Sequence, residues 1–458
     1  MPNPHSMSAI TIDAVLNRCL LSLPGGAKWA RFQGRAASFA EQGMQGAANL
    51  AANVLLARSL SHEGFATIGT MLGIHYFVLG LHRTAIVLPF IVDAAEHGDN
   101  RKEALGHWWW LNLLALAVIA ATLALLSLWC HDIAANRADL LWLVHALDLT
   151  VLVTPPLLFF EFGRRTLYQA GLPATAAATS AIYLTALLAT ISLLSGAASS
   201  TEGAAIAWAL AGLLSGLCCT LAVPPGKLRL VDCREAWTRN RAFAFWQALT
   251  SIPYAIFNSS VAVPVGLIFG PVTAATFNAA RALTNPAISI VSAVDSMDKP
   301  KASHALANGG VNALHATIRG TRKLLIMLTG TYLGLLMLAA APITHWVFGP
   351  VYSGLANEIR LLCLAFLLMC LNQPSETLLI VLRESRLLLT IRCAIAVFAI
   401  VALMLAAPYG TIGCCTALVL TQAVNLVALQ MAERTCLKRH FARRPRATRH
   451  PHSCEASA

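Results

Sequence analysis

Apolar residues come in blocks of about twenty along the chain, and short polar segments separate the blocks. An α-helix needs ~20 apolar residues to cross the hydrocarbon core of a bilayer. The blocks predict spans at 36–57, 65–91, 107–129, 139–160, 172–195, 203–223, 243–269, 271–294, 324–347, 361–382, 387–408 and 411–432. The pattern therefore predicts an all-α polytopic membrane protein with about twelve transmembrane helices.

The composition agrees with this class. Of 458 residues, 57% are hydrophobic and 12% are charged, and the mean hydropathy is +0.65. Soluble domains carry roughly 25% charged residues, so a soluble enzyme and a disordered protein are excluded. The 12 cysteines form no C-x-x-C pair, and neither a P-loop nor a G-x-S-x-G motif is present. We expect no catalytic centre, no metal site and no cofactor.

The net charge of +12 comes from 33 Lys and Arg against 21 Asp and Glu. If the N-terminus lies inside, 27 of the 33 basic residues fall in inner segments, 3 in outer loops and 3 within spans. Cytoplasmic loops of membrane proteins are enriched in Lys and Arg. The charge therefore predicts an orientation with both termini cytoplasmic, and it does not indicate a nucleic-acid partner.

The basic segment 224–242 divides the twelve spans into two sets of six. Both sets open with a span that carries a polar stripe, which hints at an internal repeat. The expected organisation is a cytoplasmic N-terminal segment 1–35, an N-lobe 36–223, an inter-lobe linker 224–242, a C-lobe 243–434 and a basic cytoplasmic tail 435–458.

Polar residues form stripes in three spans. They are Glu41, Gln45, Asn49 and Asn53 in the first span, Gln247, Ser251, Tyr254 and Asn258 in the seventh, and Asn278, Arg281, Asn285, Ser289 and Ser292 in the eighth. Residues at these spacings share one face of a helix. Lipid does not tolerate such a face, so it lines either a water-filled cavity or a hydrogen-bonded contact between helices.

Three arginines and three carboxylates lie inside the predicted spans. They are Arg83, Arg281 and Arg392, and Glu41, Asp148 and Glu376. An arginine at mid-membrane costs ~2.5–3.5 kcal/mol on insertion scales, so Arg281 is expected either to contact an anion in a cavity or to pair with a buried carboxylate. Arg83 and Arg392 lie near span ends and can snorkel. The carboxylates are candidate proton or cation sites, or partners of the arginines, and Asp148 is also placed to pair with His145.

Four segments resemble the polysaccharide-transporter family, the oligosaccharide repeat-unit flippases of the multidrug/oligosaccharidyl-lipid/polysaccharide (MOP) superfamily. They are residues 53–67 (NVLLARSLSHEGFAT), 276–283 (TFNAARAL), 346–352 (WVFGPVY) and 409–413 (YGTIG). They are similar to that family's first hairpin, its eighth helix, the loop that closes its ninth helix and the turn before its twelfth. The segments are short, and their order and spacing over residues 36–434 give the likeness its weight.

This resemblance implies a MATE-like, V-shaped bundle of two six-helix lobes around a cavity lined by helices one, two, seven and eight. It implies translocation of a polyprenyl-diphosphate-linked oligosaccharide to the outer leaflet of a bacterial inner membrane, for surface polysaccharide or O-antigen synthesis. A polysaccharide polymerase and export machinery would be partners. Arg281, and then Arg83, would meet the diphosphate or an acidic sugar. The other expected cavity residues are Asn278, Asn285, Gln45, Asn49, Gln247, Tyr254 and Asn258.

Two other functions compete with a flippase. A MATE-like cation-coupled multidrug antiporter of the same superfamily would need a site dominated by carboxylates, whereas Arg281 at mid-membrane favours an anion. A membrane-embedded polysaccharide polymerase or ligase would need a large outer loop for its catalytic groups. The longest predicted outer loop spans only residues 348–360. We therefore expect a secondary transporter and not an enzyme.

Overall fold

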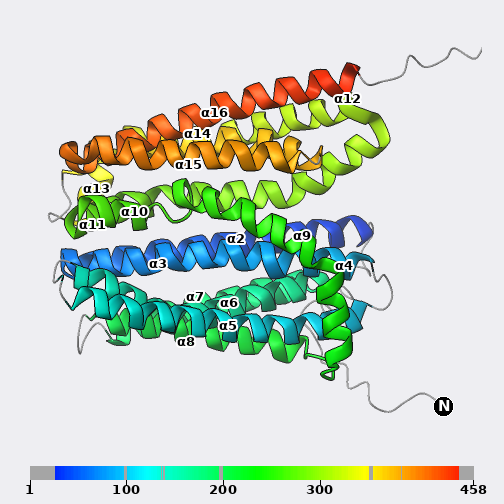
Figure 1. The fold of residues 1–458 in the computed structure, drawn as a ribbon, viewed down its shortest axis with the longest axis horizontal. Coiled ribbons are helices and arrows are strands. Elements are labelled where there is room, and N and C mark those ends of the chain that lie inside the picture. Colours follow the sequence, from blue (N-terminus) through cyan, green and yellow to red (C-terminus); the bar gives the residue numbers. More distant parts are fainter. Residues whose placement is uncertain are drawn as a thin grey trace, which may run out of the picture.

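The computed structural model describes residues 26–96, 101–135, 137, 140–194, 200–349, 354–382 and 384–442, and they contain helices but no strand. The helices run roughly parallel in a two-lobed bundle (Figure 1). Most of the predicted N-terminal segment 1–35 and part of the predicted tail 435–458 lie outside the described residues. The predicted all-α fold class is confirmed.

The first half of the chain forms one lobe. Its elements are α2 (Gly26–Ser59), α3 (His62–His82), the π-helix η1 (Arg83–Val87), α4 (Leu88–Glu96), α5 (Arg101–Ala134), α6 (Leu141–Gln169), α7 (Pro173–Leu194) and α8 (Thr201–Ala222). Because α3, η1 and α4 follow one another without a gap, they form a single span with a π turn inside it. Helix α6 packs between α5 and α8, and α2 packs along α7.

The second half begins with a helix that joins the lobes. Its elements are α9 (Leu230–Phe257), α10 (Ala262–Phe269), α11 (Pro271–Thr284), α12 (Pro286–Leu338), α13 (Ala340–Phe348), α14 (Ala356–Val381), α15 (Ser385–Ala406), the 3-10 turn η5 (Ala407–Tyr409) and α16 (Gly410–Ala442). Helices α9 and α10 meet at an angle of 47°. Helix α12 turns at Gly310, whose φ of 66° suits glycine, so its parts before and after this residue belong to two different spans.

Apolar helices account for the expected spans. Within the described residues, eight helices are long and apolar enough to cross a membrane, or nine with the bent pair α9–α10. One of the eight, Ser385–Arg439, contains two helices, α15 and α16. The other two predicted spans correspond to the less apolar α2, which carries the polar stripe, and to the helix that Asn285-Pro286 breaks between α11 and α12. The chain is therefore a multi-pass membrane protein, and the helices of its described residues match the about twelve predicted spans.

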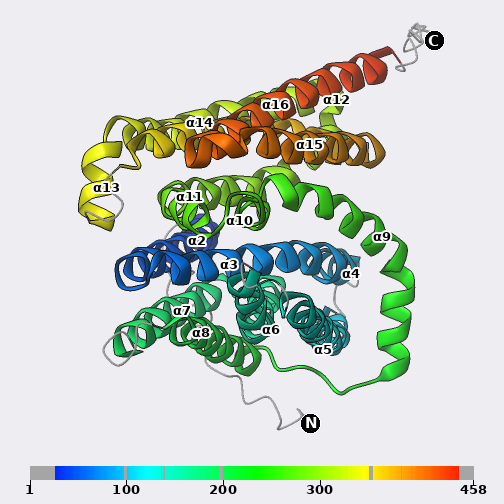
Figure 2. The same ribbon diagram turned by 60° about the vertical axis from the view of Figure 1, so that its left-hand side comes forward.

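The lobes meet along α2 and α3, which form the layer between α6–α8 and the second half of the chain (Figure 2). Gly69 of α3 and Gly46 of α2 permit the close approach. A Cβ on Gly69 would lie 1.8 Å from Nδ2 of Asn278, and one on Gly46 would lie 3.0 Å from Oγ of Ser289. Small residues allow membrane helices to pack this closely. The shared core of both lobes lies at this contact.

The two ends of the bundle differ. We call the end where α2 begins and α16 ends the basic end, and the other the far end. At the far end Arg58 of α2 donates from Nε to the backbone oxygen of Val347 at 2.6 Å and from Nη2 to that of Trp346 at 2.5 Å. These acceptors close α13 in the opposite lobe. The two lobes are therefore joined at the far end.

Candidate functional site

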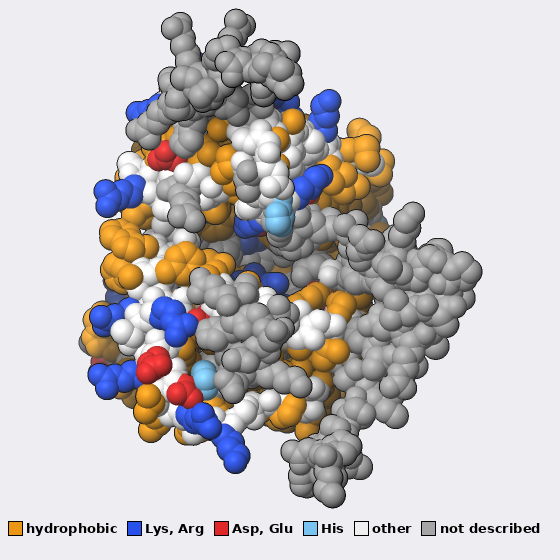
Figure 3. Space-filling view, turned by 90° about the vertical axis from the view of Figure 1, so that its right-hand side faces the viewer, with side chains coloured by type: hydrophobic (Ala, Val, Ile, Leu, Met, Phe, Trp, Pro, Cys, Tyr) orange, Lys and Arg blue, Asp and Glu red, His pale blue; other side chains and the backbone are white. Residues whose placement is uncertain are grey.

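A recess opens between the lobes at the basic end. Figure 3 looks onto this end and shows a hollow between the two lobes, with Lys and Arg side chains in it and around it. The joined far end and the open basic end together define a bundle that is accessible from one side. Such a shape suits a transporter in one of its two access states.

A cluster of charges, the η1 cluster, lies in the first lobe where α2, η1 and α6 meet. Arg83, the first residue of the π turn, donates from Nε to Oε1 of Glu161 at 2.8 Å. Arg165 approaches the same oxygen from Nη2 at 3.2 Å. Arg164 pairs with both Glu161 and Glu41. Single π turns inside α-helices are found frequently at functional sites.

The η1 cluster holds three guanidinium groups against two carboxylates, so its formal charge is +1. The side chains of Glu41 and Glu161 are 1% and 5% exposed, whereas that of Arg83 is 45% exposed. Glu41 also accepts from the hydroxyl of Tyr168 at 2.7 Å. Because the carboxylates are buried and fully used, the excess positive charge is shared by Arg83 and Arg165, whose side chain is 27% exposed, and Arg83 is the more exposed of the two.

Two residues of the polar stripe on α2, Glu41 and Gln45, take part in this cluster. Gln45 donates to Oε1 of Glu41 at 3.1 Å and to Oγ of Ser180 on α7 at 3.3 Å. Asn53 donates to the backbone oxygen of Asn49 at 2.7 Å. Glu41 and Gln45 therefore hold α2 to α6 and α7, which is the hydrogen-bonded contact weighed for this stripe.

Arg281 lies at the break between α9 and α10. Its Nη2 donates to the backbone oxygen of Asn258 at 2.9 Å and to that of Ser259 at 3.0 Å. The last carbonyls of a helix lack intrahelical partners and carry partial negative charge. The guanidinium satisfies them, so its partner within the protein is a helix end and not the buried carboxylate considered from the sequence.

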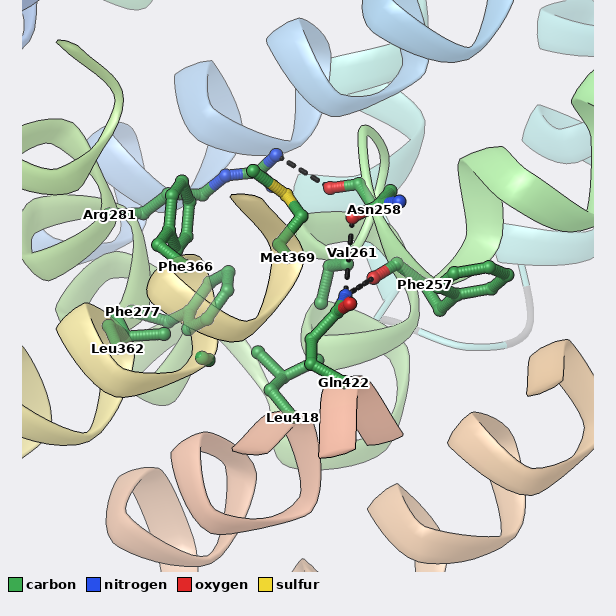
Figure 4. Close-up of a pocket in the computed structure, with 11 residues that line it drawn as sticks. Phe257, Asn258, Val261, Phe277, Arg281, Leu362, Phe366, Met369, Leu418 and Gln422 are labelled. Carbon is green, nitrogen blue, oxygen red and sulfur yellow. Dashed lines mark hydrogen bonds between the residues drawn. The ribbon is translucent and has the colours of Figure 1, made fainter. Parts of the chain in front are cut away.

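A small pocket borders Arg281 and the broken span (Figure 4), with a volume of about 310 Å³ that includes open space. On its other side Gln422 of α16 donates to the backbone oxygen of Phe257 at 3.3 Å and to Oδ1 of Asn258 at 3.2 Å. Phe277 and Phe366 supply apolar walls. Two side chains from different helices thus complete the hydrogen bonding of the break.

The second lobe contains its own charged pairs. Arg392 of α15 donates to Oε2 of Glu376 on α14 at 2.8 Å, and its guanidinium lies 4.4 Å from the ring centroid of Tyr254 on α9. It also reaches the backbone oxygen of Thr250 at 3.3 Å. Arg392 is therefore turned into the lobe, and the snorkelling considered from the sequence does not occur.

Asp148 differs from the prediction in its partner. It accepts from Ser127 and lies 3.0 Å from Nε2 of His131, both on α5. His145 instead lies 3.0 Å from Oγ1 of Thr201 and 3.2 Å from Glu202 on α8. The expected pairing of His145 with Asp148 is wrong, because the two side chains leave α6 towards different neighbouring helices.

The other predicted cavity residues are divided between the interface and the helix ends. Asn278 faces Gly69 across the lobe interface, and Asn285 lies at the junction of α11 and α12. The backbone oxygen of Gln247 accepts from Thr250 and from Ser251. The structure brings Gln45 and Arg83 to the η1 cluster and Asn258, Tyr254 and Arg281 to α9–α11, as two separate groups.

Sequence reasoning missed Glu161, Arg164 and Arg165, because it ended the fourth span at 160 and assigned both arginines to a loop. Helix α6 continues to Gln169. The spacing of one glutamate with arginines three and four residues later was the available signal. Asp93 was also missed. Among the described residues, no group of His, Cys, Asp or Glu could hold a metal ion.

Solved structures with a similar fold are membrane transporters. An inward-facing multidrug resistance MATE family transporter of the MOP superfamily gives a TM-score of 0.65 at 17% identity, over 87% of this chain and 96% of that chain. A mutant of a Vibrio cholerae MATE transporter gives a TM-score of 0.63 at 14% identity, over 92% of this chain and 98% of that chain. No protein-family model and no curated protein matches the chain.

A third similar structure is a MOP superfamily transporter from Pyrococcus furiosus, for which a binding pocket of reverse polarity suggests a different function. It gives a TM-score of 0.60 at 16% identity, over 89% of this chain and 94% of that chain. An outward-facing MATE family transporter gives a TM-score of 0.57, which is lower than the TM-score of 0.65 for the inward-facing one. The chain therefore has the fold of the MATE transporters of the MOP superfamily.

Proposed function

We propose that the protein is a flippase of the polysaccharide-transporter type. It moves a lipid-diphosphate-linked oligosaccharide from the cytoplasmic to the outer leaflet of a bacterial inner membrane by alternating access. The observation that carries the proposal is the η1 cluster, which has an excess positive charge and whose most exposed member is Arg83. A guanidinium binds phosphate oxygens with paired hydrogen bonds.

The chemistry of the site favours an anion over a cationic drug. Glu41, Glu161 and Glu376 each have an arginine partner, so none of them is available to a cation without breaking an ion pair. The similar structures named as multidrug transporters share the fold at 17% identity or less. The charge of the η1 cluster therefore supports the flippase over a multidrug antiporter.

In this proposal Arg83 meets the diphosphate at the basic end, and the sugars extend toward the polar residues of α9, α11 and α12. Those residues are Asn278, Asn285, Gln247, Tyr254, Asn258 and Arg281, with Gln45 and Asn49 on the opposite wall. Glu41, Asp148 and Glu376 are the candidate coupling groups. Protonation of Glu41 would loosen Arg164, and protonation of Glu376 would loosen Arg392. Coupling would then act through these arginines.

Deletion of the protein in its host, followed by analysis of lipid-linked sugars, tests the function. We expect repeat units to accumulate on the cytoplasmic face and surface polysaccharide to be lost. Normal surface polymer together with increased sensitivity to dyes would instead support the antiporter. A fluorescent reporter fused after Ala458 should be active in the cytoplasm if both termini lie there.

A further inference from the structure

The start of α9 differs from every long helix in direction. Figures 1 and 2 show its first part running across the basic end of the bundle, whereas its second part joins the second lobe. A segment that crosses the end of a set of membrane spans lies along the membrane surface. The first part of α9 is therefore placed at the level of the lipid headgroups.

One face of this segment is fixed to the first lobe. Asp93 of α4 is 2% exposed and accepts from Asn240 at 3.3 Å, from Arg239 at 3.2 Å and from the indole of Trp108 at 2.9 Å. Cys233 and Ala236 are buried on the same face. The segment is thus a packed part of the fold with a defined outer side.

The outer side carries the α9 stripe, which consists of Leu230, Arg234, Trp237, Arg241 and Phe245. The spacing i, i+4, i+7, i+11, i+15 places all five on one face, which lies about 100° around the helix from the buried side formed by Cys233, Ala236 and Asn240. Leu230 is 74% exposed, Phe245 62% and Trp237 38%, and both arginines are exposed. Water disfavours such a surface, whereas the membrane interface accommodates apolar and aromatic residues among arginines.

We propose that the α9 stripe is a binding surface for acidic phospholipids. The apolar members enter the boundary between headgroups and acyl chains, and Arg234 and Arg241 bind the phosphate-bearing headgroups. Charge complementarity selects this occupant, since Lys227 and Arg229 extend the positive charge. Of the two acidic residues in this segment, Asp232 is engaged by His107 at 3.1 Å and lies 3.8 Å from Arg229. Glu235 is exposed beside Arg234, and the basic residues Lys227, Arg229, Arg234, Arg239 and Arg241 outnumber the two acids.

Photo-crosslinking of the full chain in bilayers tests this surface. Equal amounts of diazirine-labelled phosphatidylglycerol and phosphatidylcholine are included, and adducts on peptides from residues 228–246 are counted by mass spectrometry. We expect several-fold more adducts from phosphatidylglycerol. In R234Q/R241Q this preference should fall to about parity, because each basic residue near an acidic surface contributes roughly 1 kcal/mol, or about fivefold.

The control variant R319Q/R434Q removes the same charge from exposed positions on α12 and α16. It should keep the preference, and R234K/R241K should keep most of it. Equal labelling by both lipids in the unaltered protein, or no adducts on 228–246, would overturn the proposal. If R234Q/R241Q does not fold, high salt applied to the unaltered protein must reduce the preference; a preference unchanged by salt contradicts it.

Discussion

The two lobes differ in how their arginines are paired with carboxylates. In the second lobe two arginines each pair with one carboxylate, as Arg392–Glu376 at 2.8 Å and Arg322–Glu433 at 2.7 Å, and the buried Arg281 binds the carbonyls at a helix end. In the first lobe the η1 cluster contains one guanidinium more than carboxylates. The pairs of the second lobe are balanced, whereas the η1 cluster has an excess positive charge that our proposal assigns to an anionic ligand. The comparison therefore sets charges that hold helices together apart from a charge that is proposed to contact the substrate.

The exposed fractions support the same distinction. The side chain of Arg392 is 12% exposed and that of Arg322 is 26% exposed, against 45% for Arg83. A charge within the membrane is usually paired or faces a water-filled cavity. Arg392 is paired and nearly buried, whereas Arg83 is paired and also exposed.

The largest effect is expected from Arg164→Gln in the η1 cluster. Arg164 is 3% exposed and pairs with both Glu41 and Glu161, so its loss removes the partner of Glu41 inside the lobe. Breaking a buried ion pair from one side costs about 3–5 kcal/mol. Unfolding in detergent, followed by circular dichroism, should show a large loss of stability. Arg165→Gln, on the next residue, should cost less than about 1 kcal/mol.

The pair in the second lobe tests whether balanced charges act only in packing. Glu376→Gln should destabilise the protein by several kcal/mol, because it leaves Arg392 without its carboxylate. Replacing both members by apolar residues, as in E376L/R392M, should recover most of the stability. If E376L/R392M is as unstable as Glu376→Gln, the two charges do more than neutralise each other. Proton coupling would then be tested first at Glu376.

Gly69→Ala tests the contact between the lobes. The new Cβ would meet Nδ2 of Asn278 at 1.8 Å, so either the Asn278 side chain turns away or α3 and α11 move apart. Overpacking of this kind costs about 1–3 kcal/mol. The combination G69A/N278A should restore part of the stability, measured in the same unfolding experiment. Gly80→Ala on the same helix, where nothing lies within 4 Å, should be neutral or slightly stabilising.

The smallest effect on stability, and the sharpest functional one, is expected from Arg83→Gln. A half-exposed ion pair contributes about 0–1 kcal/mol, so unfolding should hardly change. Loss of charge-assisted hydrogen bonds to a diphosphate should reduce export of repeat units by about tenfold or more. Surface polysaccharide would be quantified at equal amounts of membrane protein. Unchanged export would reject Arg83 as a headgroup contact.

Arg281→Ala separates the two roles of that arginine. Because Arg281 holds the freed carbonyls of Asn258 and Ser259, its loss should reduce both stability and export. Unchanged export at normal protein levels would reject Arg281 as a substrate contact.

The positions of the spans could be predicted closely, because hydrophobicity is a local property of the chain. The predicted span 172–195 corresponds to α7 at Pro173–Leu194, and 387–408 to α15 at Ser385–Ala406. The fourth span was ended too early because Glu161 and the two following arginines are polar. Their partners come from η1 and α2, and a hydropathy pattern carries no information on such long-range contacts.

The candidate site was predicted only in part. Arg83 and Arg281 were singled out from the sequence, but their partners in the structure, Glu161 and the carbonyls of Asn258 and Ser259, were not predicted. Arg281 binds the end of a helix whose break at residues 258–261 the sequence did not locate. Tyr168 and Glu41 meet although they are 127 residues apart.

The sequence by itself determined a multi-pass helical protein and its charge distribution, because lipid imposes about twenty apolar residues on each span and charge inside the membrane is rare and costly. Only the tertiary structure decided which charges neutralise one another and which remains exposed. The physical reason is that an ion pair depends on side chains brought within about 4 Å from different helices. Packing sets that distance, so Arg164 is buried between two carboxylates while Arg83, in the same cluster, remains half-exposed.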